Sequence, residues 1–299
     1  MRWVVWISAA LATVLAALYV AGKRKIARVE PVDYASVKPS EGAQFVVTRS
    51  GRVHYQDLGT GPPIVLIHGS GRSIADWQEG VIERLVQDHR VIAYDCYGFG
   101  RSERNRKFTY GYNLWVAQVV DVLDALGIEH VTVVGHSVGG ALALMLAAEH
   151  PSRVDHVVTV GTGIAVEPQQ FIPVVPGVGE LMIARETMFG PPLSPGNKQA
   201  LEEAFTVRGT RTALLQYIRR QMTIDGLRVM LTGTFSRVTV PILHISGTND
   251  RNISPKAARR LAKITGGAFL SIKDATHNVH ADTPDELVTA IRSFLSRRH

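Results

Sequence analysis

The alternation of apolar and polar positions along this chain of 299 residues predicts one α/β body behind an apolar N-terminal segment. Short apolar runs rich in β-branched residues are typical of parallel strands that are buried on both faces. Such runs predict strands at Ile64–Ile67, Val91–Tyr94, Val131–Val134, Val157–Val160, Ile242–Ile245 and Phe269–Ile272. A hairpin is expected to open the sheet, with strands at Gln44–Thr48 and Arg52–Asp57.

Longer segments between these runs have the spacing of helices. The last two predicted helices each begin with a proline, after the capping residues Ser254 and Thr283. The predicted helices are Ala75–Gln87, Tyr110–Leu126, Val138–Glu149, Pro255–Ile264 and Pro284–Ser296. Strands that alternate with helices in this way predict a doubly wound, mostly parallel sheet of eight strands.

Residues 164–237 interrupt the alternation, because they contain no convincing strand. Proline-rich turns and helical patches at Lys198–Phe205 and Arg211–Gln221 occupy this interval instead. An insertion of this length is too long for a simple loop, so we expect a helical cap. The chain then divides into an apolar segment with its basic flank (1–28), a linker (29–43) and an α/β domain (44–299).

The N-terminal segment Trp3–Gly22 contains no charged residue. A helix of that length spans roughly 30 Å, the thickness of the hydrocarbon core of a bilayer. Cations follow it directly, at Lys23, Arg24, Lys25 and Arg28. A cleaved signal peptide is the main alternative, but the long run and the cations after it favour an uncleaved single-pass anchor. The lipid bilayer is thus an expected partner, through residues 3–22. The cations favour a cytoplasmic body, and Arg2 leaves the opposite orientation open.

The formal net charge of +7 does not indicate a nucleic-acid-binding protein. Residues 1–30 carry five Lys or Arg and one Glu, so more than half of the excess lies beside the apolar segment. The remaining basic residues are scattered, and we expect no nucleic-acid partner. The single cysteine excludes an internal disulfide and a thiolate metal cluster.

The strongest chemical signal is Gly135-His-Ser-Val-Gly139, placed between a predicted strand and a predicted helix. Two glycines around a serine in that setting are what a nucleophile elbow requires, so Ser137 is the candidate nucleophile. Its hydroxyl needs a base and an orienting acid, which follow it along the chain in this arrangement. Asp250 is the preferred acid, because it follows a strand at the carboxyl edge of the sheet, and Glu167 is the fallback.

Two histidines after the last strand compete as the base, His277 and His280. We favour His277 because it lies nearer the end of the strand. No carboxylate–histidine cluster with metal-ligand spacing accompanies the pair, so neither a metal nor a cofactor is expected. The backbone N–H groups of Ser70 and Val138 are the candidate oxyanion donors. Ser70 lies in the glycine turn His68-Gly-Ser-Gly71, which lacks the residues of a phosphate-binding loop.

Together these motifs resemble the α/β-hydrolase superfamily over about residues 44–298. His68-Gly69 with Trp77 resembles the family's oxyanion loop, and Asp95 to Ser102 resembles its D-x-x-G-x-G-x-S turn. His277 followed by Asp282 and Pro284 is similar to the family's catalytic histidine segment, which supports His277 over His280. A serine at the elbow argues against dehalogenases and epoxide hydrolases, which carry aspartate there.

The resemblance implies a serine hydrolase, which we expect the apolar segment to anchor in the membrane. We expect a carboxylic ester or acyl compound as its small-molecule substrate. Carbon–carbon bond hydrolases and cofactor-free perhydrolases share the same motifs and remain alternatives, as does a non-catalytic scaffold. The cap is expected to offer apolar surface to the substrate, through Phe171, Ile172, Val174, Val175, Leu181, Met182, Met188 and Phe189.

Overall fold

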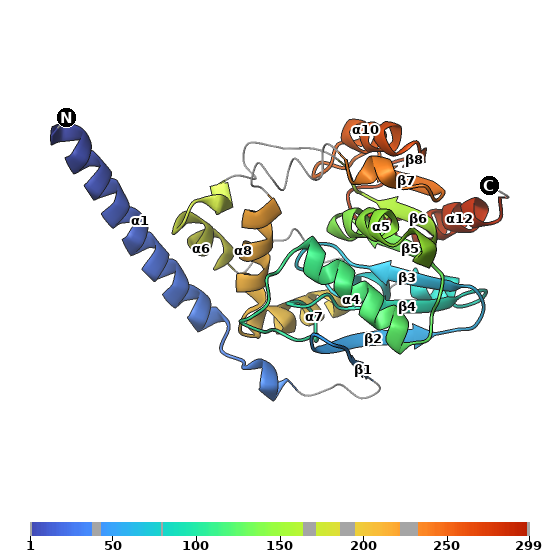
Figure 1. Ribbon diagram of the computed structural model, residues 1–299, viewed down its shortest axis with the longest axis horizontal. Helices are drawn as coiled ribbons and strands as arrows, with labels where there is room; N and C mark the ends of the chain where they lie inside the picture. The colour runs from blue at the N-terminus through green and yellow to red at the C-terminus, as the bar shows by residue number, and fades with distance from the viewer. Residues whose placement is uncertain are drawn as a thin grey trace.

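A central eight-stranded sheet organises the computed structural model (Figure 1). The structure describes residues 2–37, 43–78, 80–163, 172–185, 195–221 and 233–297. The sheet order is β1-β2-β4-β3-β5-β6-β7-β8. The strands are β1 (Gln44–Val47), β2 (Arg52–Leu58), β3 (Pro63–Ile67), β4 (Arg90–Tyr94), β5 (Val131–His136), β6 (Val154–Val160), β7 (Ile242–Gly247) and β8 (Ala268–Ile272).

Only the β1–β2 and β2–β4 pairs are antiparallel, and the other five pairs are parallel. The predicted fold class, a mostly parallel doubly wound sheet of eight strands, is therefore confirmed. Strands β3, β5, β6 and β7 end side by side, with Ile67 opposite Gly135 and Gly135 opposite Thr159. Their carboxyl ends form the edge at which a site is expected in such a sheet.

Helices cover both faces of the sheet, and a separate hydrophobic core lies under each face. On one face lie α4 (Tyr112–Ala125), α5 (Val138–Glu149) and α10 (Pro255–Thr265). On the other face lie α2 (Ala75–Gln78), α3 (Ile82–Leu85) and α12 (Pro284–Leu295), with the short α11 (Val279–Asp282) before it. Single turns of 3-10 helix lie at Tyr34–Ser36, Pro151–Arg153 and Phe235–Arg237.

The expectation of one helix over Ala75–Gln87 was wrong, because the chain breaks into α2 and α3. Gly80 separates them with a φ of +104°, which an L side chain rarely adopts. A Cβ at Gly80 would also lie 3.0 Å from Cβ of Pro284. Contact with a residue far along the chain therefore fixes this break.

Three helices lie in the described part of the predicted cap: α6 (Val178–Ile183), α7 (Pro195–Thr206) and α8 (Thr210–Gln221). The helical patches predicted from the sequence lie inside α7 and α8. Several residues singled out from the sequence fall outside the described residues: Glu167, Phe171, Met188 and Phe189.

Helix α1 (Arg2–Val29) projects from the body at its N-terminal end, and residues around Leu15 to Gly22 lie beside α6 (Figure 1). It is the one described helix long and apolar enough to cross a membrane, and a signal sequence would pass the same test. The predicted linker continues from it in contact with the cap. Glu30 is buried and accepts hydrogen bonds from N–H of Gly209 at 2.9 Å and of Arg211 at 2.6 Å.

Candidate active site

Ser137 lies at a sharp turn between β5 and α5, with φ 52° and ψ −112°. Few residues other than glycine adopt a positive φ, so the turn holds backbone strain at the candidate nucleophile. Neighbouring glycines make the turn sterically feasible. A Cβ at Gly135 would collide with the backbone of Gly139, and a Cβ at Gly139 would collide with the backbone of Ile67. A Cβ at Gly140 would strike the Thr162 hydroxyl.

His277 and Asp250 form a hydrogen-bonded pair beside this turn. Nδ1 of His277 lies 2.8 Å from Oδ2 of Asp250. The other oxygen of Asp250 accepts N–H groups of Asn252 and Ile253, each at 2.8 Å. A carboxylate oxygen can only accept, so Nδ1 of the neutral ring carries the proton and Nε2 keeps a lone pair. A base that removes a proton from serine needs that lone pair.

Strand β6 and the turn after it bring the nucleophile and the histidine together. N–H of Ser137 donates to the carbonyl of Val160 at 2.8 Å, and the Thr162 hydroxyl donates to the carbonyl of Ser137 at 2.9 Å. Between those two contacts, a Cβ at Gly161 would lie 3.1 Å from Nδ1 of His277. Ser137 and His277 therefore both border the segment 160–162.

The predicted oxyanion loop lies next to the elbow. A Cβ at Gly69 would lie 3.6 Å from Cβ of Ser137, which places the Gly69-Ser70 segment beside the nucleophile and the start of α5 at Val138. His68 holds the loop, because N–H of Cys96 donates to its Nε2 at 3.0 Å and its Nδ1 lies 2.7 Å from the carbonyl of Gly69. Burial lowers the pKa of His68, so the ring is neutral and both contacts are satisfied.

The competing histidine, His280, has a different position. It is fully buried, and its ring centroid lies 5.1 Å from that of Trp77 and 4.4 Å from that of His136. The candidate acid, Asp250, forms its ion pair with the other histidine, His277. Burial lowers the pKa of His280 to about 4, so this imidazole stays neutral. Its position favours packing under the site over proton transfer with Ser137.

His136, which the sequence reasoning did not single out, supports His277 directly. Its Nε2 lies 3.0 Å from the carbonyl of His277, and a carbonyl can only accept, so Nε2 carries the proton. Burial first, and then the neighbouring His280 and His277, lower the pKa of His136. The residue therefore acts as a neutral donor that fixes the backbone of the histidine loop.

A second contact that the sequence reasoning missed joins the oxyanion loop to the cap. Nε of Arg72 donates to both oxygens of Asp76, at 3.0 and 2.9 Å. Asn197 of α7 accepts from Arg72 at 3.1 Å and donates to Asp76 at 2.8 Å. All three side chains are buried. The i, i+4 spacing of Arg72 and Asp76 could have indicated this ion pair from the sequence. Their contact with Asn197 in the cap could not have been predicted in that way.

Asp76, His136 and His280 place one ligand atom each within 4.8 Å of one another. Two neutral histidines and a carboxylate are a donor set that suits a cation. Arg72, however, already occupies both carboxylate oxygens, and its buried positive charge opposes a second cation there. We therefore assign no metal to this cluster.

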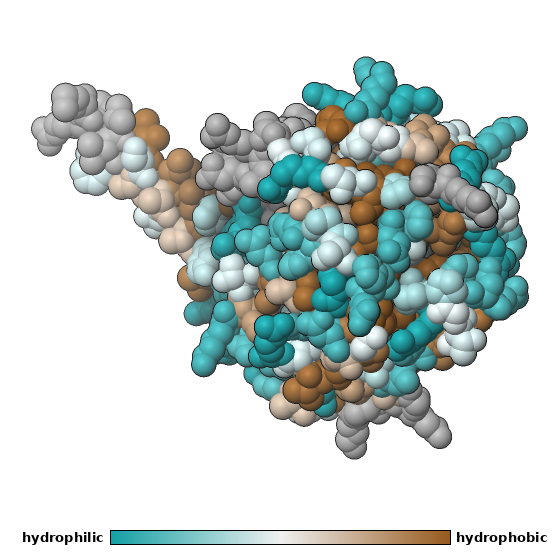
Figure 2. Space-filling model, turned by 45° about the vertical axis from the view of Figure 1, so that its right-hand side comes forward, coloured by the Kyte–Doolittle hydropathy of each residue, from teal (hydrophilic) through white to brown (hydrophobic). Residues whose placement is uncertain are grey.

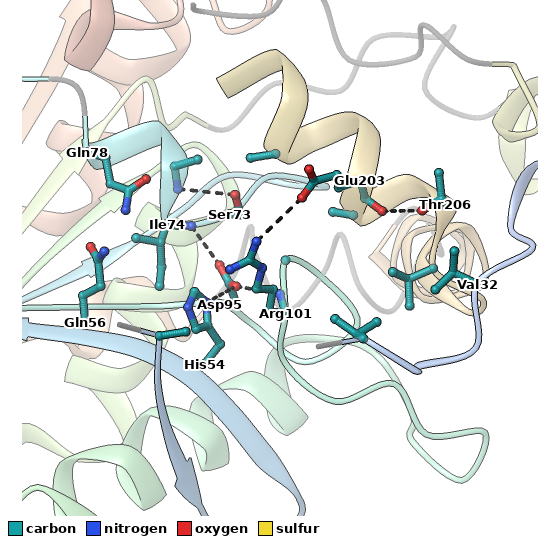
Figure 3. A pocket seen from close by; sticks show the side chains of 17 residues that line it. Val32, His54, Gln56, Ser73, Ile74, Gln78, Asp95, Arg101, Glu203 and Thr206 are labelled. Atoms are coloured by element: carbon teal, nitrogen blue, oxygen red, sulfur yellow. Dashed lines mark hydrogen bonds and ion pairs between the residues drawn. The ribbon is translucent and has the colours of Figure 1, made fainter. Parts of the chain in front are cut away.

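The turn from Asp95 to Ser102 lies beside a cavity of about 540 Å³, and its hydrogen bonds hold the surrounding backbone (Figure 3). Asp95 accepts N–H of Ile74 at 2.8 Å and N–H of Arg101 at 2.7 Å, and it pairs with His54 at 2.7 Å. Burial raises the pKa of Asp95, but its hydrogen bonds with the His54 side chain and the N–H of Arg101 help to hold that pKa below its ordinary value. The described lining of the cavity includes none of Ser137, Asp250 and His277.

Comparison with known proteins agrees with this geometry. The sequence model of the alpha/beta hydrolase fold matches residues 62–190. A 2-hydroxymuconate semialdehyde hydrolase of Pseudomonas sp. (strain CF600) is 42% identical over 119 residues, which is 39% of this chain. The matched segment spans only 42% of that relative's length.

A second relative and one solved structure extend the match along the chain. A 2-hydroxy-6-oxononadienedioate/2-hydroxy-6-oxononatrienedioate hydrolase of Burkholderia vietnamiensis (strain G4) is 30% identical over 230 residues, 70% of this chain and 78% of the relative. The structure described as a membrane phospholipase A, a novel bacterial virulence factor, is 21% identical. It superimposes with a TM-score of 0.65 and covers 98% of this chain and 97% of its own.

Proposed function

Because the chain belongs to the α/β-hydrolase superfamily, we propose that it is a serine hydrolase that cleaves a carbon–carbon bond in a 2-hydroxy-6-oxo-dienoate. The observation that carries this proposal is the match to the Burkholderia vietnamiensis hydrolase over most of both chains. The names of the relatives support this carbon–carbon alternative better than the ester substrate that the sequence analysis preferred.

The chemistry of such a substrate explains why a carbon–carbon bond must break. 2-Hydroxymuconate semialdehyde has an enol, a diene, an aldehyde and a carboxylate, but no ester or amide. After the 2-hydroxyl proton moves to C5, C6 is an isolated carbonyl that a serine can attack. Breaking the C5–C6 bond then leaves the electron pair delocalised over C5 to the C2 oxygen. Water releases formate from the enzyme, and 2-hydroxypenta-2,4-dienoate is the other product.

In this reaction the described residues take the roles that their geometry supports. Ser137 attacks C6, and Nε2 of His277 accepts the hydroxyl proton while Asp250 holds the ring by Nδ1. His277 then gives this proton to the C2 oxygen of the departing dienolate. The N–H groups of Ser70 and Val138 stabilise the oxyanion. The same groups then serve the hydrolysis of the acyl-enzyme, with His277 activating water.

The test is a comparison of substrates on the full chain. We expect 2-hydroxymuconate semialdehyde to be consumed with formation of formate, with kcat/KM at least about 100-fold above that for p-nitrophenyl esters. Ser137→Ala should abolish this turnover, and Gln199→Ala on the exposed face of α7 should not. Ester turnover without any formate would contradict the proposal.

A second candidate is the hydrolysis of lipid esters by a membrane-anchored enzyme. One observation favours it: the match to the membrane phospholipase A covers 98% of this chain, a span that includes most of the apolar helix α1. Release of fatty acid from phosphatidylglycerol vesicles, lost in Ser137→Ala, tests this candidate. Under either candidate, we propose that α1 anchors the protein in the bilayer and that the body faces the cytoplasm.

A further inference from the structure

We propose that residues 172–177, called here the cap edge, dock into the lipid bilayer beside α1, so that the cap enters the membrane interface. The proposal goes beyond the anchor and beyond the catalytic function. It assigns a second membrane-binding surface and a fixed depth for the cap.

The cap edge is apolar, and Ile172, Val175 and Pro176 in it are exposed. Its sequence is Ile-Pro-Val-Val-Pro-Gly, without a charged residue. The side chains of Ile172 and Val175 are 46% and 40% exposed, which is unusual for large aliphatic residues lying this close together. Placing them in the interface removes that apolar surface from water.

The cap edge is continuous with α1. A Cβ at Gly177 would lie 2.8 Å from the carbonyl oxygen of Leu15 and 2.9 Å from the backbone nitrogen of Tyr19. Further along, Gly22 packs so closely on Glu180 of α6 that a Cβ there would collide with it. Two glycines thus let the helix and the cap approach backbone to backbone, as small residues do at helix crossings.

The depth of this contact follows from the position of the cations. Lys23, Arg24 and Lys25 are exposed and end the apolar run. Such side chains stay at the level of the lipid headgroups. At 1.5 Å per residue, the contact at Leu15–Tyr19 lies about 6 to 12 Å on the apolar side of Lys23. Interfacial segments of proteins lie at a similar depth of about 5 to 10 Å.

The ion pair between Glu180 and Arg219, behind the cap edge, does not oppose this placement. Glu180 is 2% exposed, and Arg219 pairs with both of its oxygens at 2.8 and 2.9 Å. The N–H of Gly177 donates to the same carboxylate at 2.8 Å. The charge behind the cap edge is therefore paired and covered.

A bilayer fits α1 better than a second copy of the chain does. The exposed apolar residues of the helix point in all directions around its axis rather than along one seam. They are Trp6, Ile7, Leu11, Val14, Tyr19 and Val20. In Figure 2 the N-terminal part of the helix stands clear of the body, with apolar atoms along it. A helix that is apolar all round is typical of a lipid environment.

The experiment measures the depth of the cap edge directly. Cys96 is the only cysteine, it is buried, and burial raises its pKa, so a thiol-reactive fluorophore will label an introduced cysteine alone. The labelled variants are Val175→Cys, Leu11→Cys on α1 and Leu270→Cys on β8. They are studied in the full chain, in vesicles of phosphatidylethanolamine and phosphatidylglycerol with a nitroxide either high on the acyl chain or near its end. Val175 and Leu270 are equally exposed, at 40% and 38%, so neither change disturbs packing.

We expect the nitroxide to quench the labels at positions 175 and 11 and to leave the label at position 270 bright. Quenching at position 11 without quenching at position 175 would overturn the proposal, because the cap would then stand off the membrane. If the label at position 175 is shielded from water only at a high protein-to-lipid ratio, the cap edge contacts a second copy of the chain instead, and the proposal is wrong. The readout needs no substrate, so its failure is distinct from failure of the proposed catalytic function.

Discussion

At Ser137 the backbone holds a conformation with positive φ that serves the side chain at the expense of stability. Typical costs of such a conformation are about 1 to 3 kcal/mol for a residue with a Cβ. The surrounding contacts hold it in place, since Val160 and Thr162 both bond to this residue.

Ser137→Gly is therefore expected to be more stable than Ser137→Ala, by about 1 kcal/mol in the free energy of unfolding. Glycine removes the strain, whereas alanine keeps it, and both remove the hydroxyl. Urea unfolding of the two variants measures the difference. Equal stability would show that the turn stores no strain.

His136 is expected to control the rate at which Ser137 reacts, through the carbonyl of His277 that it holds. His136→Ala should slow labelling of Ser137 by a fluorophosphonate about 10-fold, because His277 loses its fixed orientation. His136→Gln, which can still donate an N–H, should recover part of that rate. The exposed His130→Ala is the matched control, and an unchanged rate in His136→Ala would contradict this role.

Among the elements, α7 and the oxyanion loop form one unit because Asn197 lies between Arg72 and Asp76. A hydrogen bond to a charged partner contributes about 1.5 to 3 kcal/mol when it is buried. The cap is therefore hydrogen-bonded directly to the loop that carries Ser70.

Asn197→Leu is expected to lower the free energy of unfolding by about 2 kcal/mol and to increase hydrogen exchange in α7 before the sheet is affected. The buried Arg72–Asp76 pair would lose two of its hydrogen bonds. Gln199→Ala, on the exposed side of the same helix, is the control and should change neither quantity. Exchange that stays slow in α7 would refute the coupling.

In the whole molecule, buried neutral histidines make stability depend on pH, and His136 and His280 are two of the four described histidines whose pKa is lowered by burial. Burial lowers the pKa of His280 to about 4 and also lowers that of His136, whereas an unfolded histidine titrates near 6.5. Between these values the unfolded chain binds more protons, so the stabilisation is complete above about pH 6.5 and is lost as the pH falls toward 4.

Each of the two histidines is expected to contribute up to about 1.4 kcal/mol per pH unit in that range. The urea midpoint should thus fall between pH 7 and pH 5, and His280→Leu should make the fall shallower. His130→Ala, an exposed histidine, should leave the slope unchanged. The same slope in His280→Leu and in the unmodified chain would exclude this source.

The sequence predicted the features that are local along the chain. The run from Val131 forms a buried strand, and Gly135 to Gly139 forms a sharp turn, because neighbouring residues impose both. Features that depend on distant contacts could not be predicted. The break at Gly80 depends on Pro284, and the packing of Gly22 depends on Glu180. No spacing or composition indicates which distant residues will meet.

The glycines around the elbow also limit how this enzyme can change. At Gly135, Gly139 and Gly140, even one added carbon would strike the backbone or Thr162. A library of random variants should therefore yield no active members with substitutions at these positions. New specificity, in the laboratory or in evolution, must arise in the cap helices and in the loops that face them. The backbone of the candidate elbow is therefore constrained, whereas the cap can vary.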